Sequence, residues 1–122
     1  MNEEERKRKY DLEERTWRFA RNVREFVRKF HKTIDVLNDL GQVARSSGSV
    51  SNNYIEANEA LSKKDFRMRI KICRKESKES NSVLRLLEVA AKPKLVDECN
   101  RLADEADQLM RIFASILHKS GP

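Results

Sequence analysis

Residues 45–66 read RSSGSVSNNYIEANEALSKKDF, and this stretch decides the fold of the 122-residue chain. Apolar side chains keep one helical register from Val43 through Tyr54 to Leu61, at the spacings that mark one face of a helix. Ser62 then stands three residues before an aspartate, which is the pattern of a helix N-cap. The stretch therefore predicts the end of one long helix, a tight turn and the start of a second helix.

The small residues in this stretch allow a competing interpretation, in which a loop at Ser46–Ser49 breaks the first of these helices. The unbroken apolar register favours one continuous helix. Gly41 and Gly48 flank its apolar face, and a glycine inside a helix costs about 1 kcal/mol relative to alanine. Two such glycines beside a serine cluster predict that a neighbouring helix approaches closely there.

Working outward, the same periodicity predicts four helices, at residues 11–30, 34–61, 63–89 and 93–119. Thr33 is a suitable N-cap for the second helix, and Pro93 suits the first position of the fourth. Residues 1–9 have no apolar face, and we expect them to form a disordered lead-in.

The fold class that follows is all-α, an up-down-up-down antiparallel four-helix bundle. Similar helix lengths and short joints favour this arrangement, which makes residues 10–119 a single domain and places the first and third helices on a diagonal. The composition agrees, because 38% of the residues are charged and only three are glycine and two proline.

Composition also bounds where the protein works. No apolar run approaches the roughly 20 residues that span a bilayer, and the N-terminus MNEEERKRKY lacks the apolar core of a signal peptide. We therefore expect a cytoplasmic protein with no membrane partner. Cys73 and Cys99 fall on apolar helical faces, so we expect buried, reduced thiols.

Charge is distributed unevenly along the chain. The net charge is +4 for residues 1–32 and +7 for residues 63–94, against −3 for residues 33–62 and −2 for residues 95–122. Residues of the third helix placed 100° apart gather six cations on an arc of about 100° that contains no carboxylate. These candidate nucleic-acid-binding residues are Lys64, Arg67, Lys71, Arg74, Lys75 and Lys78.

The first helix adds three candidates opposite its apolar face, Arg18, Arg21 and Arg28. Rows of cations along a helix suit the phosphates of nucleic acid and read no base sequence. The alternative is a solvated surface whose charge is balanced by acids on the second and fourth helices.

A second apolar face on the third helix predicts self-association, because a lone bundle needs only one. Trp17 lies among arginines and away from the phenylalanines of its helix. We favour packing of Trp17 against a neighbouring subunit over stacking on a nucleic-acid base. The candidate oligomer interface comprises Trp17, Met68, Ile72, Glu76, Val83 and Leu86.

Several short motifs match one family in order and spacing between residues 10 and 87. They are Tyr10–Thr16, Phe19–Ala20, Arg45–Val50, Asn53–Ala57, Ser62–Phe66 and Lys75–Glu76. Through them the chain resembles the bacterial four-helix-bundle proteins encoded by intervening sequences in large-subunit ribosomal RNA genes, also described as ribosomal-protein-like. One departure is Ser51–Asn52, where many relatives have Gly-Ala.

The resemblance implies a four-helix protomer, commonly assembled as a homopentamer, with no known enzyme activity. A relative in the same superfamily, the accessory variability determinant of diversity-generating retroelements, binds nucleic acid and a reverse transcriptase.

Residue types needed for catalysis are missing from the expected patterns. The two histidines, His31 and His118, have no glutamate three residues before them, so the sequence predicts no di-iron or other metal site and no cofactor. The serine cluster lacks a G-x-S-x-G elbow, and no phosphate-binding loop occurs. We expect neither an enzyme nor a small-molecule substrate.

Two functions remain as hypotheses. The first is a non-enzymatic homo-oligomer that binds nucleic acid, most readily RNA, through cations of the first and third helices. The second is a protein-interaction scaffold, or accessory subunit, that docks an acidic partner or a reverse-transcriptase-like protein.

Overall fold

The computed structural model describes residues 2–121, except for the side chain of Tyr10, which opens the first family motif. It contains α1 (Glu3–Lys29), α2 (Ile34–Asn58), α3 (Lys63–Ala90) and α4 (Pro93–Lys119). Over the described residues no strand occurs, and no helix there is long and apolar enough to cross a membrane. The prediction of an all-α four-helix bundle is confirmed.

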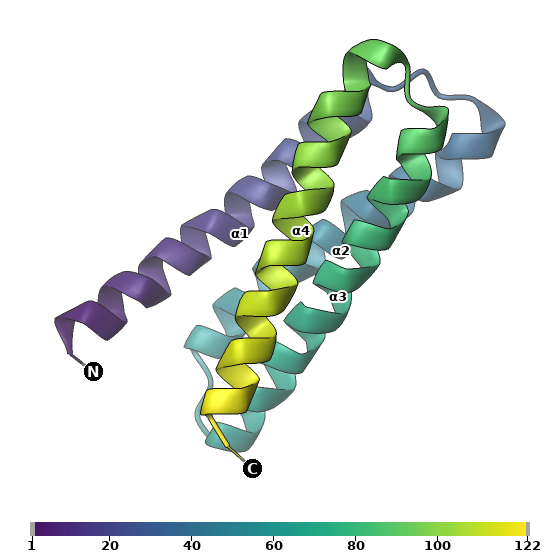
Figure 1. The fold of residues 1–122 in the computed structure, drawn as a ribbon. Coiled ribbons are helices and arrows are strands. Elements are labelled where there is room, and N and C mark those ends of the chain that lie inside the picture. The colour runs from purple at the N-terminus through teal and green to yellow at the C-terminus, as the bar shows by residue number, and fades with distance from the viewer. Residues whose placement is uncertain (1, 122) are drawn as a thin grey trace.

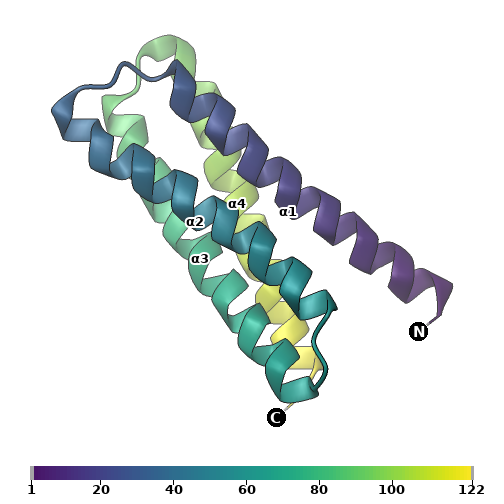
Figure 2. The ribbon, with the colours of Figure 1, turned by 180° about the vertical axis from the view of Figure 1, so that it is seen from behind.

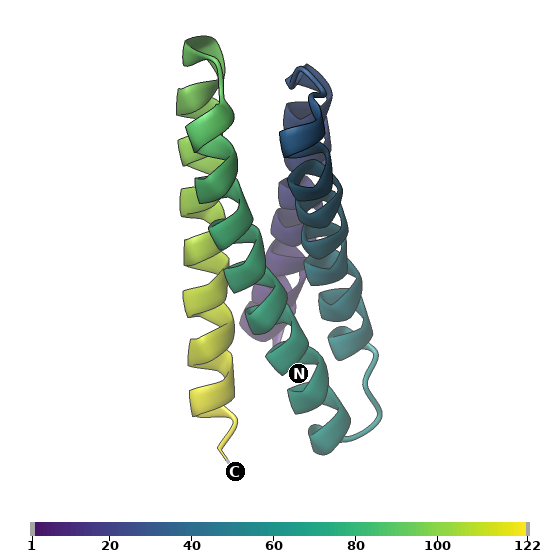
Figure 3. The same ribbon diagram turned by 90° about the vertical axis from the view of Figure 1, so that its right-hand side faces the viewer.

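The helices run antiparallel in chain order, and each contacts the next (Figure 1). α4 also contacts α1, whereas α1 and α3 do not contact each other, so these two helices lie on a diagonal, as predicted. Viewed from the side, α1 and α2 form one layer and α3 and α4 the other (Figure 3). Seen from behind, α1 diverges from the bundle toward its N-terminus (Figure 2).

The first helix begins at Glu3, earlier than the sequence analysis expected. The side chain of Asn2 accepts a hydrogen bond from the Glu5 amide at 2.7 Å, and the acidic first turn complements the helix dipole. Lys9 donates to the carbonyl oxygen of Asn58 at 3.0 Å, which ties this segment to the end of α2. The expectation of a disordered lead-in overlooked capping, which needs no apolar face.

The other helix ends lie close to the predicted positions. Ser62 caps α3 by accepting the Asp65 amide at 3.1 Å, and Pro93 begins α4. Thr33 stands at the N-cap of α2, but its hydroxyl donates to the Asp35 carboxylate and caps no amide. α2 ends at Asn58, three residues before the predicted end.

The core contains most of the predicted apolar faces of all four helices, but Leu61, the last residue of the register predicted for the second helix, lies beyond α2 and is 99% exposed. Phe19, Phe26 and Phe113 are among its largest fully buried side chains. The α2 helix continues through the serine cluster without a break, and Ser46 and Ser80 share a buried hydrogen bond of 2.7 Å between α2 and α3. Small hydroxyl side chains therefore let these two helices pack closely, although the buried Ser77 hydroxyl of α3 has no hydrogen-bond partner among the described residues.

The two α2 glycines do not serve the close helix approach that was expected of them. A Cβ atom on Gly41 would meet nothing within 4 Å, while one on Gly48 would lie 2.8 Å from Nη2 of Arg24. At Gly48 the missing side chain thus makes room for a guanidinium group of α1 rather than for a neighbouring backbone.

Both cysteines are buried and free, as predicted. Burial raises the pKa of the Cys73 thiol from 9.0 to about 12 and that of the Cys99 thiol to about 11. Each thiol lies near a backbone carbonyl of another helix, with Cys99 Sγ 3.1 Å from the Leu84 oxygen. At neutral pH these groups are unreactive thiols, as befits core residues.

Candidate nucleic-acid interface

Hydrogen bonds fix which sides of α3 face its neighbours. Toward α2, Arg69 donates to Asn53 at 3.0 Å, and Glu76 accepts from Arg45 at 3.4 Å. Toward α4, Asn81 donates to the Ala103 carbonyl oxygen at 2.7 Å. The side of α3 between these two directions, opposite the core, is left for solvent.

Most of the predicted cations of α3 lie on this outer side. Lys64, Lys71, Arg74, Lys75 and Lys78 are all exposed. Within the described part of the chain, none of them forms an ion pair. At 1.5 Å per residue, this row extends over about 21 Å. The acids of α2 and α4 therefore do not neutralise it by direct contact.

Arg67 differs from the other predicted cations. Its Nη1 donates to the Leu117 carbonyl oxygen at 2.8 Å and contacts the Ser120 hydroxyl, and its side chain is half-buried. These bonds satisfy groups at the C-terminal end of α4, where a cation also complements the helix dipole. Arg67 is thus a structural residue, and its prediction as a nucleic-acid contact is not supported by its position.

Arg85 is a cation of the same side that the sequence analysis missed. It is exposed and has no ion pair in the described structure. Eighteen residues make five full helical turns, so Arg85 has the same direction as Arg67 and could have been found from periodicity. We call the set on this side the α3 stripe; it comprises Lys64, Lys71, Arg74, Lys75, Lys78 and Arg85.

The predicted cations of α1 have mixed surroundings. Arg18 pairs with Glu14 at 3.1 Å along the helix. The guanidinium carbon of Arg21 lies 5.5 Å from the ring centroid of Trp17, within the range of a cation–π contact. Arg28 is exposed and forms no ion pair in the described residues.

The structure does not bring the two predicted cation rows together. α1 and α3 lie on the diagonal of the bundle, so their outer sides point in opposite directions. One rigid ligand cannot contact both rows on a single subunit. The single cationic surface that the sequence predicted is therefore two separate surfaces.

The predicted oligomer-interface residues of α3 also differ in exposure, and only some of them lie at the surface. Met68 is 54% exposed and Leu86 is 58% exposed, and Ile72 is half-buried. Val83 and Glu76 are buried within the subunit, where Val83 joins the core cluster and Glu76 pairs with Arg45. These two residues were wrongly expected at the surface, because the side of α3 that they occupy faces α2.

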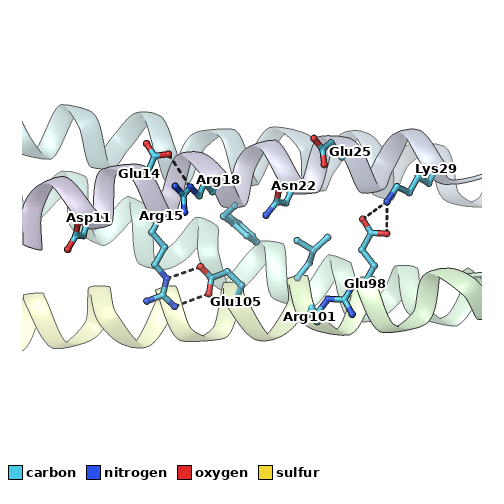
Figure 4. Close-up of a pocket in the computed structure, with 12 residues that line it drawn as sticks. Asp11, Glu14, Arg15, Arg18, Asn22, Glu25, Lys29, Glu98, Arg101 and Glu105 are labelled. Carbon is cyan, nitrogen blue, oxygen red and sulfur yellow. Dashed lines mark hydrogen bonds and ion pairs between the residues drawn. The ribbon is translucent and has the colours of Figure 1, made fainter.

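An open groove of about 980 Å³ separates α1 from α4 (Figure 4). Arg15 and Glu105 bridge it with two hydrogen bonds of 2.8 Å, and Lys29 and Glu98 bridge it at 3.0 Å. The hydrogen bond to Glu105 raises the pKa of Arg15. The lining side chains include five acids and four bases, so this groove offers no surplus positive charge to a polyanion. Its existence depends on the tilt of α1, which no sequence pattern signals.

Residues 8–115 match the family model described as 23S rRNA-intervening sequence protein. The chain belongs to this family. The match covers most of the chain and extends the resemblance seen in the short motifs through most of α4.

Among solved structures, the family member is similar to a crystal structure from Bacteroides thetaiotaomicron, described as a protein with unknown function from the S23 ribosomal protein family. The two share 20% sequence identity with a TM-score of 0.74, over 90% of this chain and 97% of the other. This likeness shows that the fold is shared. A comparison with curated proteins finds no relative.

Neither the family description nor the neighbouring structure names an enzymatic reaction. In the part of the chain that the structure describes, no group of three or more His, Cys, Asp or Glu side chains could hold a metal ion. The feature left to account for is the unpaired charge of the α3 stripe.

Proposed function

We propose that this protein is a non-enzymatic, homo-oligomeric helical bundle that binds nucleic acid, with RNA as the expected ligand, through the α3 stripe. The observation that carries the proposal is the absence of carboxylate partners for these six exposed cations among the described residues. A surface cation that already pairs with a carboxylate adds little binding free energy with a phosphate. An unpaired cation that contacts a phosphate releases counterions, and this release favours binding.

The shape of the stripe suits a duplex. From Lys64 to Arg85 it extends over about 32 Å of a straight helix. A duplex presents one negative charge for about every 1.7 Å of its axis, so each cation has several phosphates within reach. We expect these cations to contact phosphates, which fix the position of a protein on a duplex and carry no base sequence.

Self-association would strengthen this binding. Met68 and Leu86 are exposed apolar side chains beside the stripe, and we propose that they and Ile72 contact another copy of the chain. Each added copy repeats the stripe, which converts a weak phosphate surface into a multivalent one. We place the protein in the cytosol, where its two free cysteines would stay reduced.

The test is binding of a labelled 20-base-pair RNA duplex to the variant Lys71→Glu/Arg74→Glu/Lys78→Glu, followed by fluorescence anisotropy. All three side chains are exposed, so the fold should persist, and affinity at 100 mM salt should fall by at least about a hundredfold. Equal affinity of the variant and the natural chain would refute the proposal.

A matched control separates the stripe from net charge alone. The variant Arg6→Glu/Lys7→Glu/Arg8→Glu changes three exposed cations at the start of α1 and lowers the formal charge of +6 by the same amount. Its affinity should stay within a few-fold of the natural chain. Equal losses in both variants would show that overall charge, and not the stripe, attracts the duplex.

A second candidate is a scaffold that docks an acidic protein, as the exposed Met68 and Leu86 beside the cations would allow. A pull-down after nuclease treatment distinguishes the two. Retention of one stoichiometric protein partner would favour the scaffold, and loss of all bound material would favour nucleic acid.

A further inference from the structure

A second cationic surface lies on the opposite side of the bundle, along the seam between α1 and α2. At 100° per residue, four side chains of α1 point within an arc of about 60° toward this seam. They are Trp17, Arg21, Arg24 and Arg28. Because Arg24 lies over Gly48 and Glu13 bonds to Asn58, the antiparallel register sets Trp17 across from Ile55. We call this surface the α1–α2 face.

Among the described residues, the three arginines of this face have no acidic partner. All are exposed, and none forms an ion pair among the described residues. Arg24 is held in place, because its Nη1 donates to the Ala20 carbonyl oxygen at 3.0 Å and its guanidinium lies over Gly48. The first and last of the row are about 10 Å apart along the helix axis. The face therefore presents three positive charges over a short length, with Arg24 held in place.

Trp17 gives this face a property that the α3 stripe lacks. Its side chain is 50% exposed, and the Arg21 guanidinium lies 5.5 Å from its ring centroid. Aromatic rings and guanidinium planes are the groups on which unpaired bases stack. In a duplex the base faces are covered by neighbouring base pairs, so only a single strand can offer them.

A second copy of the chain is the other occupant that could cover Trp17, and the sequence analysis favoured it. The charges argue against that occupant. Contact with the cation-rich α3 side of another copy would place like charges together, and burying unpaired charge is costly. Only the acidic segments of another copy, residues 33–62 and 95–122, could pair these arginines, and a change of Trp17 emission with protein concentration would reveal that contact. A polyanion with flat bases satisfies both the cations and the ring.

We propose that the α1–α2 face binds single-stranded nucleic acid by stacking a base on Trp17 while Arg21, Arg24 and Arg28 contact its phosphates. This proposal rests on the proposed function only in taking nucleic acid as the ligand. It adds a second site, distinct from the α3 stripe, with a preference for unpaired bases.

The chain contains one tryptophan, so its fluorescence reports this face alone. The experiment titrates the full chain with an eight-nucleotide oligothymidylate and with an abasic strand of the same length and charge. Stacking should quench Trp17 emission with the oligothymidylate, whereas the abasic strand and an RNA duplex should leave it nearly unchanged. Equal quenching by all three, or binding of the oligothymidylate without quenching, would overturn the proposal.

Two further measurements separate the remaining explanations. A shift of Trp17 emission with protein concentration alone, before any strand is added, would show that another copy covers the ring and would overturn the proposal. In the variant Lys71→Glu/Arg74→Glu/Lys78→Glu, quenching by the oligothymidylate should persist. A variant that loses duplex binding but keeps quenching supports this site, whereas loss of both overturns it as an independent site.

A substitution at the ring completes the test. Trp17→Leu keeps an apolar side chain at an exposed position and should weaken oligothymidylate binding by about tenfold, measured by anisotropy of a labelled strand. The matched control is Val89→Ala, an exposed apolar change on α3 that should leave this affinity unaltered. Equal effects of the two changes would contradict a stacking role for Trp17.

Discussion

The α3 stripe and the α1–α2 face carry the same sign of charge on opposite sides of one bundle, yet they are built differently. The stripe is long, contains only cations and has no aromatic side chain. The α1–α2 face is short, and its arginines surround an exposed tryptophan. Two surfaces with the same sign of charge can therefore suit different ligands. The length of the α3 stripe favours an extended duplex, and the exposed tryptophan ring of the α1–α2 face favours unpaired bases.

The largest expected difference between the two surfaces is their response to salt. Six phosphate contacts on a duplex give a slope of about −5 in log affinity against log salt, which is about a thousandfold loss between 50 and 200 mM. Three contacts on a single strand give a slope of about −2, or about a twentyfold loss. Anisotropy titrations at four salt concentrations would measure both slopes.

The single-strand slope in that series is best taken on the variant Lys71→Glu/Arg74→Glu/Lys78→Glu, which removes competing contacts on the stripe. The duplex slope is taken on the natural chain. Two equal slopes would break the comparison, because both ligands would then be using the same cations.

A smaller effect concerns the two glycines of α2. Gly48→Ala should displace the Arg24 guanidinium and weaken single-strand binding by a few-fold, with duplex affinity unchanged. Gly41→Ala is the matched control, since a Cβ there meets nothing within 4 Å. It should leave both affinities unchanged and stabilise the fold by up to about 1 kcal/mol through helix propensity. Thermal unfolding and strand titration of both variants would measure these effects. If the Gly48→Ala and Gly41→Ala variants bound the single strand with identical affinity, Arg24 would not contribute to single-strand binding.

The smallest expected effect on either surface is that of pH below about 9, because neither surface contains a histidine. Stability should change above this pH. Thiols in the unfolded chain ionise from about pH 9, while burial keeps Cys73 protonated to about pH 12 and Cys99 to about pH 11. Burial likewise raises the pKa of Tyr54 from 10.0 to about 12.

All three groups hold their protons more tightly in the folded state, so their stabilisation is complete below the unfolded pKa values and is lost as pH rises toward 12. Melting temperatures from pH 7 to 11 should be constant to about pH 9 and then fall. Loss of one binding activity at pH 8, with the melting temperature unchanged, would show that a titrating group serves that surface.

Much of the fold could be predicted because it depends on local chemistry. The apolar register through the serine cluster predicted an unbroken α2. Ser62 and Pro93 predicted the first residues of α3 and α4 correctly. The candidate site was predicted less completely. Periodicity gave the outer cations of α3, but it could not show that Arg67 would bend toward the end of α4.

The sequence by itself determined four amphipathic helices, their order and the row of cations on the third, since each follows from spacing along one chain and needs no partner. The tertiary structure alone decided which sides of those helices stayed open. Packing against α2 buried Val83 and Glu76, and the diagonal placement of α1 and α3 divided one expected surface into two. Whether a side chain is exposed depends on the helices that pack around it, and the spacing of residues along one helix does not specify those helices.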